Sequence, residues 1–205
     1  MQKFLSVTGM AAPMPAANVD TDVIMPKVFL KGIDRAGLAR GLFHDLRFDA
    51  KGRTRPDFIL NRETMRDVRF LLTGPNFGCG SSREHAVWGT LQYGIRALIG
   101  TTFAGIFADN AANNGLLLIS LGEDDRDRLF RAAGPDGAEL TVDLVERTVT
   151  CGGLRLAFEI EPSRRQALME GRDRIATTLQ MKEQIREFEA AYFAEAPWLA
   201  RGGAA

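Results

Sequence analysis

Between residues 68 and 133 the sequence alternates short apolar runs of strand length with longer amphipathic stretches of helical length. The runs predict strands and the stretches predict helices, because each shows the hydrophobic period of its element. Strands and helices in alternation favour an α/β layer in which neighbouring strands run parallel. The expected elements, in order, are a strand at 68–73, a helix at 82–93, a strand at 97–101, a helix at 103–113, a strand at 116–120 and a helix at 124–133.

The pattern changes after residue 136, where β-like runs follow one another without helices between them. The Gly152-Gly153 pair is a strong signal for a two-residue hairpin turn. The sequence therefore predicts a mixed sheet with flanking helices. The later elements are expected as strands at 140–144, 148–151 and 154–160, and as helices at 162–170 and 181–193.

The first third of the chain gives weaker signals. Residues 3–8 predict a short strand, and residues 9–15, which include two prolines, predict irregular chain. Asp34 is the expected N-cap of a helix. No shift of composition marks a domain boundary, so we expect one domain over 1–205 with an ordered core at about 3–193. The tail after Trp198 is expected to fray.

Composition excludes several classes of function. Lys and Arg number 26 and Asp and Glu number 26, so the net charge of zero gives no general attraction to nucleic acid or to an anionic membrane. No apolar run approaches the roughly 20 residues that span a bilayer. The two cysteines, Cys79 and Cys151, exclude a disulfide framework and favour a reducing cytoplasm. With the isolated histidines His44 and His85, they supply no ligand set for a metal in this chain.

Chemically versatile side chains gather between the expected strand 68–73 and the helix that follows it. Glycines there permit backbone conformations that side chains forbid. Free N–H groups and the positive end of the dipole at a helix start favour an anion. We call residues 74–83 the glycine–serine loop and take it as the candidate site. The residues that single it out are Gly74, Gly78, Gly80, Ser81, Ser82, Arg83 and, just beyond it, His85.

Two nucleotide motifs and one structural motif compete for this loop. A Walker loop needs a Lys that the segment lacks. The dinucleotide fingerprint fails at its last glycine, where Arg83 would prevent close helix packing. Ser81 and Glu84 also fit a capping box, in which the Ser81 hydroxyl caps the helix. Capping and function are compatible, because a cap requires neither a second hydroxyl nor Arg83.

The run Asn-Phe-Gly-Cys-Gly-Ser-Ser-Arg-Glu-His-Ala at 76–86 resembles the signature of the swivelling domain of the aconitase superfamily. Further segments resemble, in order and spacing, the small subunits of bacterial 3-isopropylmalate dehydratases. The likeness covers roughly residues 3–193 and implies one swivelling β/β/α domain of the aconitase C-terminal type. The further segments are 18–31, 102–110 with Asn113 and Asn114, and 175–180.

The resemblance implies an activity and a partner. The family enzyme removes water from 2-isopropylmalate and returns it in the other orientation, giving 3-isopropylmalate in leucine biosynthesis. A separate large subunit would hold a [4Fe–4S] cluster, and this chain would bind no cofactor. This chain would be active only in the heterodimer with that subunit. Ser81 would be the base that removes a proton from carbon. Backbone N–H groups and Arg83 would stabilise the resulting alkoxide.

The resemblance also implies supporting residues. Ser82 and Arg83 would hold a substrate carboxylate, Arg83 through its bidentate fork. Asp22 would orient Arg83, although an Asx-type turn explains the same residue. The remaining members of the expected site are Phe29 and Leu30, which would contact the isopropyl group unless they belong to the core, and Gly80, Glu84 and His85.

Two alternatives stay open at this point. One is the small subunit of a related hydro-lyase that acts on citraconate or 2-methylmalate. The other belongs to a different class, a stand-alone module that binds anions without a partner. Substrate assays with a partner separate the first from the leading interpretation, and ligand binding by the isolated chain tests the second.

Overall fold

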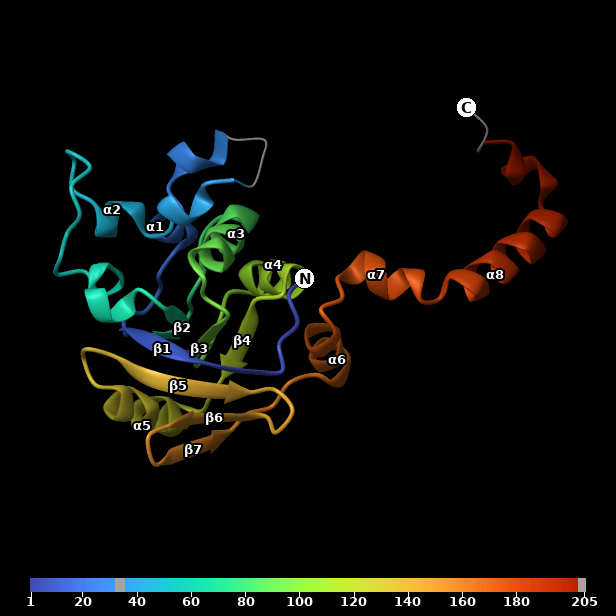
Figure 1. Cartoon of the computed structure of the whole chain (residues 1–205). Coiled ribbons are helices and arrows are strands. Elements are labelled where there is room, and N and C mark those ends of the chain that lie inside the picture. The colour runs from blue at the N-terminus through green and yellow to red at the C-terminus, as the bar shows by residue number, and fades with distance from the viewer. Residues whose placement is uncertain (32–35, 203–205) are drawn as a thin grey trace.

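The computed structural model describes residues 1–31 and 36–202, and the side chains of these residues up to 199. The described residues form a mixed sheet of seven strands with helices on both faces (Figure 1), which confirms the predicted α/β class. The strands are β1 (Ser6–Met14), β2 (Val68–Thr73), β3 (Ala97–Gly100), β4 (Leu117–Ser120), β5 (Ala138–Asp143), β6 (Thr148–Cys151) and β7 (Leu154–Ala157). Their order across the sheet is β4-β3-β2-β1-β5-β6-β7.

The half of the sheet from β1 to β4 is parallel, as the alternating pattern predicts. The helices α3 (Glu84–Tyr93), α4 (Gly105–Asn114) and α5 (Glu123–Ala133) follow strands β2, β3 and β4. Successive side chains of a strand point to opposite faces. Leu71 accordingly packs with α3 and α4, whereas Phe70 and Leu72 pack with α5. Both faces of the parallel half are therefore buried, as such sheets require.

Strand β1 is longer than expected and lies at the centre of the sheet. The prediction of irregular chain at 9–15 is wrong, because β1 pairs parallel with β2 and antiparallel with β5. Its register shifts between Met10 and Ala11. Pairing on both sides overrides the weak strand propensity of Gly9 and Pro13, since strand formation depends mainly on context.

The half of the sheet from β5 to β7 is antiparallel. Gly152 adopts a left-handed conformation with a φ of 54° in the turn between β6 and β7, which confirms the predicted hairpin. Helix α6 (Pro162–Glu170) begins where the Glu161 carboxylate accepts hydrogen bonds from the N–H groups of Ser163 and Arg164. Its buried Leu168 joins the cluster beneath this half, and its carbonyl accepts from the N–H of Phe4.

The remaining short elements lie between β1 and β2, next to α3 (Figure 1). The expected N-cap Asp34 lies outside the described residues, and residues 38–40 form a 3₁₀ turn where an α-helix was expected. The short elements are α1 (Thr21–Ile24), α2 (His44–Arg47) and the 3₁₀ turns η1 (Lys27–Lys31), η2 (Leu38–Arg40), η3 (Ile59–Asn61) and η4 (Glu63–Met65).

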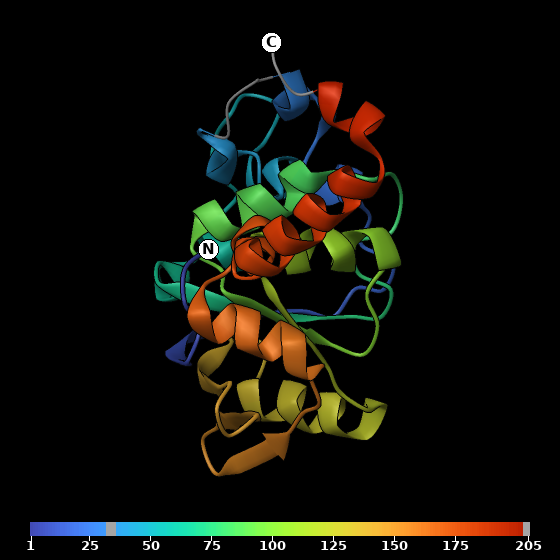
Figure 2. The ribbon, with the colours of Figure 1, turned by 90° about the vertical axis from the view of Figure 1, so that its right-hand side faces the viewer.

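The chain after α6 leaves the rest of the molecule. It forms α7 (Arg174–Leu179), α8 (Lys182–Glu195) and the 3₁₀ turn η5 (Pro197–Gly202). Figure 1 shows this segment extending away from the sheet, and Figure 2 shows it passing in front of the helices that cover the sheet. We call residues 174–202 the C-terminal arm and the described residues before it the body. The helix at 182–195 confirms the expected one at 181–193, whereas α7 was not predicted.

Candidate functional site

The glycine–serine loop begins where β2 ends, against the end of β1. The N–H of Gly74 donates to the carbonyl of Met14 at 3.0 Å. A Cβ atom at Gly74 would lie 2.3 Å from the carbonyl oxygen of Ala16. The backbones of two neighbouring segments therefore approach each other at a distance that only glycine permits.

Backbone and side-chain hydrogen bonds hold the middle of the loop on two sides. The Asn76 N–H donates to the Thr102 hydroxyl at 2.8 Å, and the Asn76 amide donates to Asn18 Oδ1 at 2.8 Å. The Gly78 N–H donates to the carbonyl of Val19 at 2.8 Å. The loop is thus fixed between the segment before α1 and the segment before α4, although its own sequence is rich in glycine.

The end of the loop does not form the predicted capping box. Helix α3 begins at Glu84 with Arg83 as its N-cap, and no side chain caps it. The Thr21 hydroxyl donates to the carbonyl of Ser81 at 2.7 Å and so fixes the backbone before the helix starts. The Glu84 carboxylate accepts from the Asn114 amide at 2.6 Å and does not reach back to the loop. The hydroxyls of the two serines are therefore not used for capping.

Arg83 is the buried charge of the site. Its side chain is only 6% exposed, and Nη1 pairs with Asp22 Oδ1 at 2.6 Å and donates to the carbonyl of Met25 at 3.2 Å. The pKa of Asp22 lies below its ordinary value because it accepts a hydrogen bond from Arg83, with smaller effects from the charges of Arg83 and Lys27. The carboxylate therefore stays ionised at neutral pH and holds one edge of the guanidinium.

A cavity of about 140 Å³ opens at the end of the loop. Ser81 and Ser82 are exposed beside it, which a catalytic or binding role requires. The cavity also includes the first turn of α4, where the side chain of Ile106 is 56% exposed. The full lining consists of Thr21, Gly78, Gly80, Ser81, Ser82, Arg83, Ala104, Gly105, Ile106 and Phe107.

Ile106 is a candidate that the sequence analysis gave no role. It lies within a segment that carries the family resemblance, and it follows Gly105 at the start of a helix. The residue after it, Phe107, is buried and forms part of the core. The signal available in the sequence was an apolar residue in the first turn of an expected helix, inside a segment that carries the family resemblance. Among the lining residues, Ile106 offers the exposed alkyl surface.

Other expected site residues lie away from the cavity. The Phe29 ring packs 5.0 Å from the His44 ring, and both Phe29 and Leu30 lie partly buried against the core. Neither lines the cavity described above. The His85 ring lies 4.7 Å from the Trp88 ring. The substrate roles of these three residues stay predictions.

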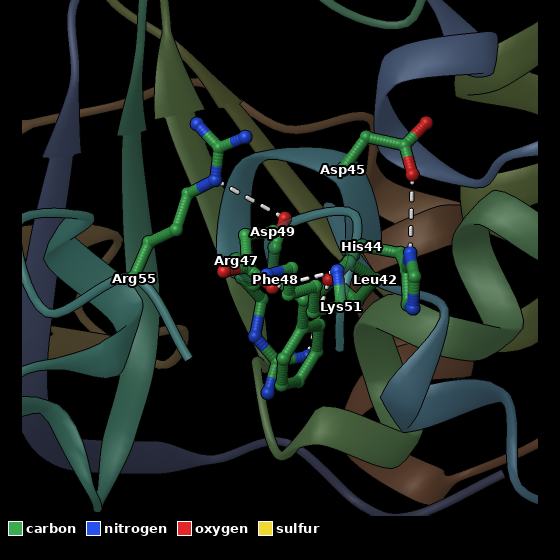
Figure 3. A network of polar contacts seen from close by, with 8 residues as sticks. All are labelled: Leu42, His44, Asp45, Arg47, Phe48, Asp49, Lys51 and Arg55. Atoms are coloured by element: carbon green, nitrogen blue, oxygen red, sulfur yellow. Dashed lines mark hydrogen bonds and ion pairs between the residues drawn. The ribbon is translucent and has the colours of Figure 1, made fainter. Parts of the chain in front are cut away.

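The other histidine of the chain, His44, belongs to a local polar network that fixes the chain around α2 (Figure 3). Its Nδ1 lies 3.1 Å from Asp45 Oδ1. Arg47 donates to the carbonyl of Leu42 at 3.1 Å. Arg55 donates to the carbonyl of Phe48. The contact of Arg55 ties the loop after α2 to the end of that helix, and that of Arg47 ties the helix to the chain before it, so these polar side chains have a structural use.

The described residues contain no group of three His, Cys, Asp or Glu side chains placed to hold a metal ion. Cys79 and Cys151 are free thiols, and burial raises the pKa of the Cys151 thiol. Within residues 1–31 and 36–202, no helix combines the length and the apolar character that a membrane crossing needs.

Together, the fold and the loop define a class: a mixed α/β domain of the aconitase C-terminal type. The profile of the aconitase C-terminal domain family matches residues 1–124. The profile described as LeuD_N matches residues 127–162, and the profile of the C-terminal domain of 3-isopropylmalate dehydratase small subunits matches residues 175–202. The chain belongs to the family of 3-isopropylmalate dehydratase small subunits, as its sequence motifs predict.

Similar proteins match over nearly the whole chain. A 3-isopropylmalate dehydratase small subunit of Mannheimia succiniciproducens is 50% identical over 97% of this chain and 99% of its own. One from Salmonella typhimurium is 52% identical over 98% of this chain and 97% of its own. The crystal structure of a 3-isopropylmalate dehydratase from Methanocaldococcus jannaschii superimposes with a TM-score of 0.67, at 24% identity, over 90% of this chain and 99% of that one. This last likeness supports the fold alone.

Proposed function

We propose that this chain is the small subunit of a 3-isopropylmalate dehydratase that interconverts 2-isopropylmalate and 3-isopropylmalate in leucine biosynthesis. The similarity of about 50% over whole chains supports the choice of reaction. The observation that carries the proposal is the pair of exposed serines beside a buried, oriented Arg83 at one cavity. The free thiols of both cysteines favour a reducing compartment, and we place the enzyme in the cytoplasm.

The proposed partner is a large subunit that carries a [4Fe–4S] cluster. When bound there, the cluster would act as a Lewis acid that eases departure of the substrate's hydroxyl. This chain would supply the groups that handle the proton and one carboxylate.

We assign Ser81 as the base. Its deprotonated hydroxyl would take a proton from the carbon beside a carboxylate, and it would return that proton to carbon in the reverse direction. A serine hydroxyl is a weak base unless the alkoxide is stabilised. The adjacent positive charge of Arg83 and the free N–H groups at the start of α3 provide that stabilisation.

We assign Arg83 and Ser82 to a substrate carboxylate. Among the described residues, the polar partners of the Arg83 guanidinium are Asp22 and the Met25 carbonyl, and both bind its Nη1 atom. Nη2 then stays available to the carboxylate, which the planar guanidinium binds with defined orientation. Asp22 would act as a positioning residue, since it fixes Nη1 without touching the substrate.

The Ser81→Ala variant tests the proposal. It removes the base while leaving the body intact, because Ser81 is exposed and its carbonyl keeps the bond from Thr21. Loss of a catalytic base costs about 10²–10⁴ in rate. We expect turnover of 2-isopropylmalate to fall by that factor in the reconstituted pair, with unchanged association. The matched control is Ser163→Ala, an exposed serine in the first turn of α6.

The outcomes separate the alternatives. Retained turnover in Ser81→Ala overturns the assignment of the base. Faster turnover of 2-methylmalate or citraconate than of isopropylmalate by the wild-type pair would identify a related hydro-lyase. Tight binding of nucleotides or simple anions by the isolated chain, seen by calorimetry, would favour the stand-alone module instead.

A further inference from the structure

The C-terminal arm exposes apolar side chains that a folded chain normally covers. Neither α7 nor α8 contains a buried residue. Ile175, Phe188 and Trp198 are 72%, 67% and 72% exposed. Exposed apolar surface on this scale marks an interaction site in soluble proteins. The exposed apolar residues of the arm are Ile175, Leu179, Met181, Phe188, Tyr192, Phe193, Trp198 and Leu199.

Four apolar residues at and within α8 form one stripe. Met181, Ile185, Phe188 and Tyr192 follow one another at spacings of four, three and four, which places them on one side of a helix. The Phe188 and Tyr192 rings stack with centroids 5.7 Å apart and planes at 15°. The stripe therefore presents a continuous ridge, the form that an apolar groove accommodates.

The exposed apolar area of the arm is as large as one partner's share of a protein–protein interface. A large side chain buries roughly 150–250 Å² when it is fully covered. The eight residues are on average about half exposed, so together they offer about 800 Å² of surface to a partner. A standard interface takes about 800 Å² from each partner. A helix of 14 residues is also marginal in water without tertiary packing. Both considerations indicate that another polypeptide covers the arm.

The base of the arm lies against the helix that follows the glycine–serine loop. Arg174 and Ile175 line a cavity of about 370 Å³ together with Asn114 and with Glu84, the first residue of α3. Figure 2 shows the arm continuing from there across the front of the helices over the sheet. The base of the arm and the start of α3 thus line one cavity.

We propose that the arm inserts its apolar stripe into an apolar groove of the iron–sulfur large subunit. This inference rests on the proposed function, because that function supplies the partner. The arm would be a docking element that lies more than 80 residues after the loop in the sequence. One partner would bind the arm and also cover the serines. The charged residues of α8, four acidic and two basic, stay in water as the polar rim of the contact.

The test compares two double variants of the full-length chain. Phe188→Ser with Tyr192→Ser removes the stacked pair of the stripe. Ala190→Ser with Ala194→Ser places two serines on the opposite side of α8 and serves as the matched control. Serine and the aromatic residues have similar helix propensities, so the stripe variant does not weaken α8 intrinsically. Affinity for the large subunit of the same organism is measured by calorimetry, and turnover of 2-isopropylmalate by titration of one subunit against the other.

We expect the stripe variant to lose roughly 30-fold or more in affinity, as the removal of two interface aromatics does. The control should change by less than about threefold, and turnover at saturating subunit should equal that of the wild type, since the loop is untouched. Equal affinities for stripe variant and wild type would overturn the inference. So would a wild-type dimer of this chain alone, seen by ultracentrifugation, that the stripe variant dissociates. Binding without turnover by the wild-type pair would count against the proposed function only.

Discussion

The glycine–serine loop is held in place although its sequence suggests flexibility, and the C-terminal arm is left unpacked although its sequence favours helices. The loop is rich in glycine, yet its backbone is bonded on one side to residues 18–21 and on the other to Thr102. The arm is rich in residues that favour helices, yet α7 and α8 bury nothing. Local propensity therefore says little about which region is held in place, because tertiary contacts decide it.

The same comparison separates two kinds of functional surface. The loop presents hydroxyls and a guanidinium whose positions are set before any ligand arrives. The arm presents alkyl and aromatic groups whose position a partner would set. A substitution at a packed glycine of the loop should thus change the body and its chemistry together, whereas a substitution in the arm should change association alone.

The largest effect is expected at Gly78. Its φ is 79°, and a Cβ atom there would lie 2.3 Å from Cγ of the buried Phe107 ring. Gly78→Ala should lower the free energy of unfolding by about 2–3 kcal/mol through backbone strain and overpacking, and should displace the serines. Urea denaturation measures the first effect, and turnover of the reconstituted pair the second.

The matched control is Gly153→Ala, which meets no atom within 4 Å and needs no positive φ. Its stability should stay within about 0.5 kcal/mol of the wild type. Equal stability of the Gly78 and Gly153 variants would mean that the loop yields to the added methyl group, and the contrast with the arm would fail.

The next effect concerns selectivity at Ile106. If this exposed side chain contacts the alkyl group of the substrate, Ile106→Ala should reduce the preference for 2-isopropylmalate over 2-methylmalate by about 10-fold, since a few methylenes in an apolar contact are worth about 1–3 kcal/mol. The measurement is the ratio of kcat/KM for the two substrates. Ile175→Ala, an exposed isoleucine in the arm, should leave that ratio unchanged. Equal ratios for both variants would mean that Ile106 does not contact the alkyl group, and Phe29 and Leu30 would again be the candidates for that contact.

Much of the fold follows from the sequence, and the exceptions share a cause. The parallel strands and their helices are predicted because each carries its own period, as in Val68–Thr73 and Glu84–Tyr93. The second part of strand β1, from Gly9 to Met14, is missed because Gly9 and Pro13 suggest irregular chain, while the two partner strands of β1 lie about 60 and 130 residues away in the sequence. Period and propensity are local quantities, and pairing at that separation is not.

The site shows the same division. The glycines, the serines and Arg83 are visible in the sequence because their types and spacing suit an anion. The contact between Asp22 and Arg83 joins residues 61 positions apart, and the sequence offers it only as one of two interpretations. The interpretation of Ser81 and Glu84 as a capping box is wrong, because the Thr21 hydroxyl binds the Ser81 carbonyl and helix α3 begins only at Glu84. Ile106 is missed because its exposure depends on the packing of α4.

The contact between Asp22 and Arg83 should show a defined pH dependence. The folded-state pKa of Asp22 is depressed, so the pair contributes stability above the ordinary value of 3.8 and loses it as the pH falls through the depressed pKa. Asp22→Asn should be less stable than the wild type by a constant amount from about pH 8 to pH 5, and the difference should shrink at lower pH. Thermal unfolding across that range measures it. A difference that instead shrinks near neutral pH would implicate another group.

The smallest effect on stability is expected from removal of the arm. A chain that ends at Asp173 keeps Leu168 buried and keeps the bond from the Met1 amino group to the Gly171 carbonyl. Its free energy of unfolding, measured in urea, should stay within about 0.5 kcal/mol of that of the full chain, because the deleted helices bury nothing. Circular dichroism should lose only the helical signal of the arm. A chain that ends at Ile160 also removes α6 and should be clearly less stable. If both truncations lower stability alike, the arm belongs to the cooperative unit of the body, and the contrast between a fixed loop and an arm positioned by its partner is wrong.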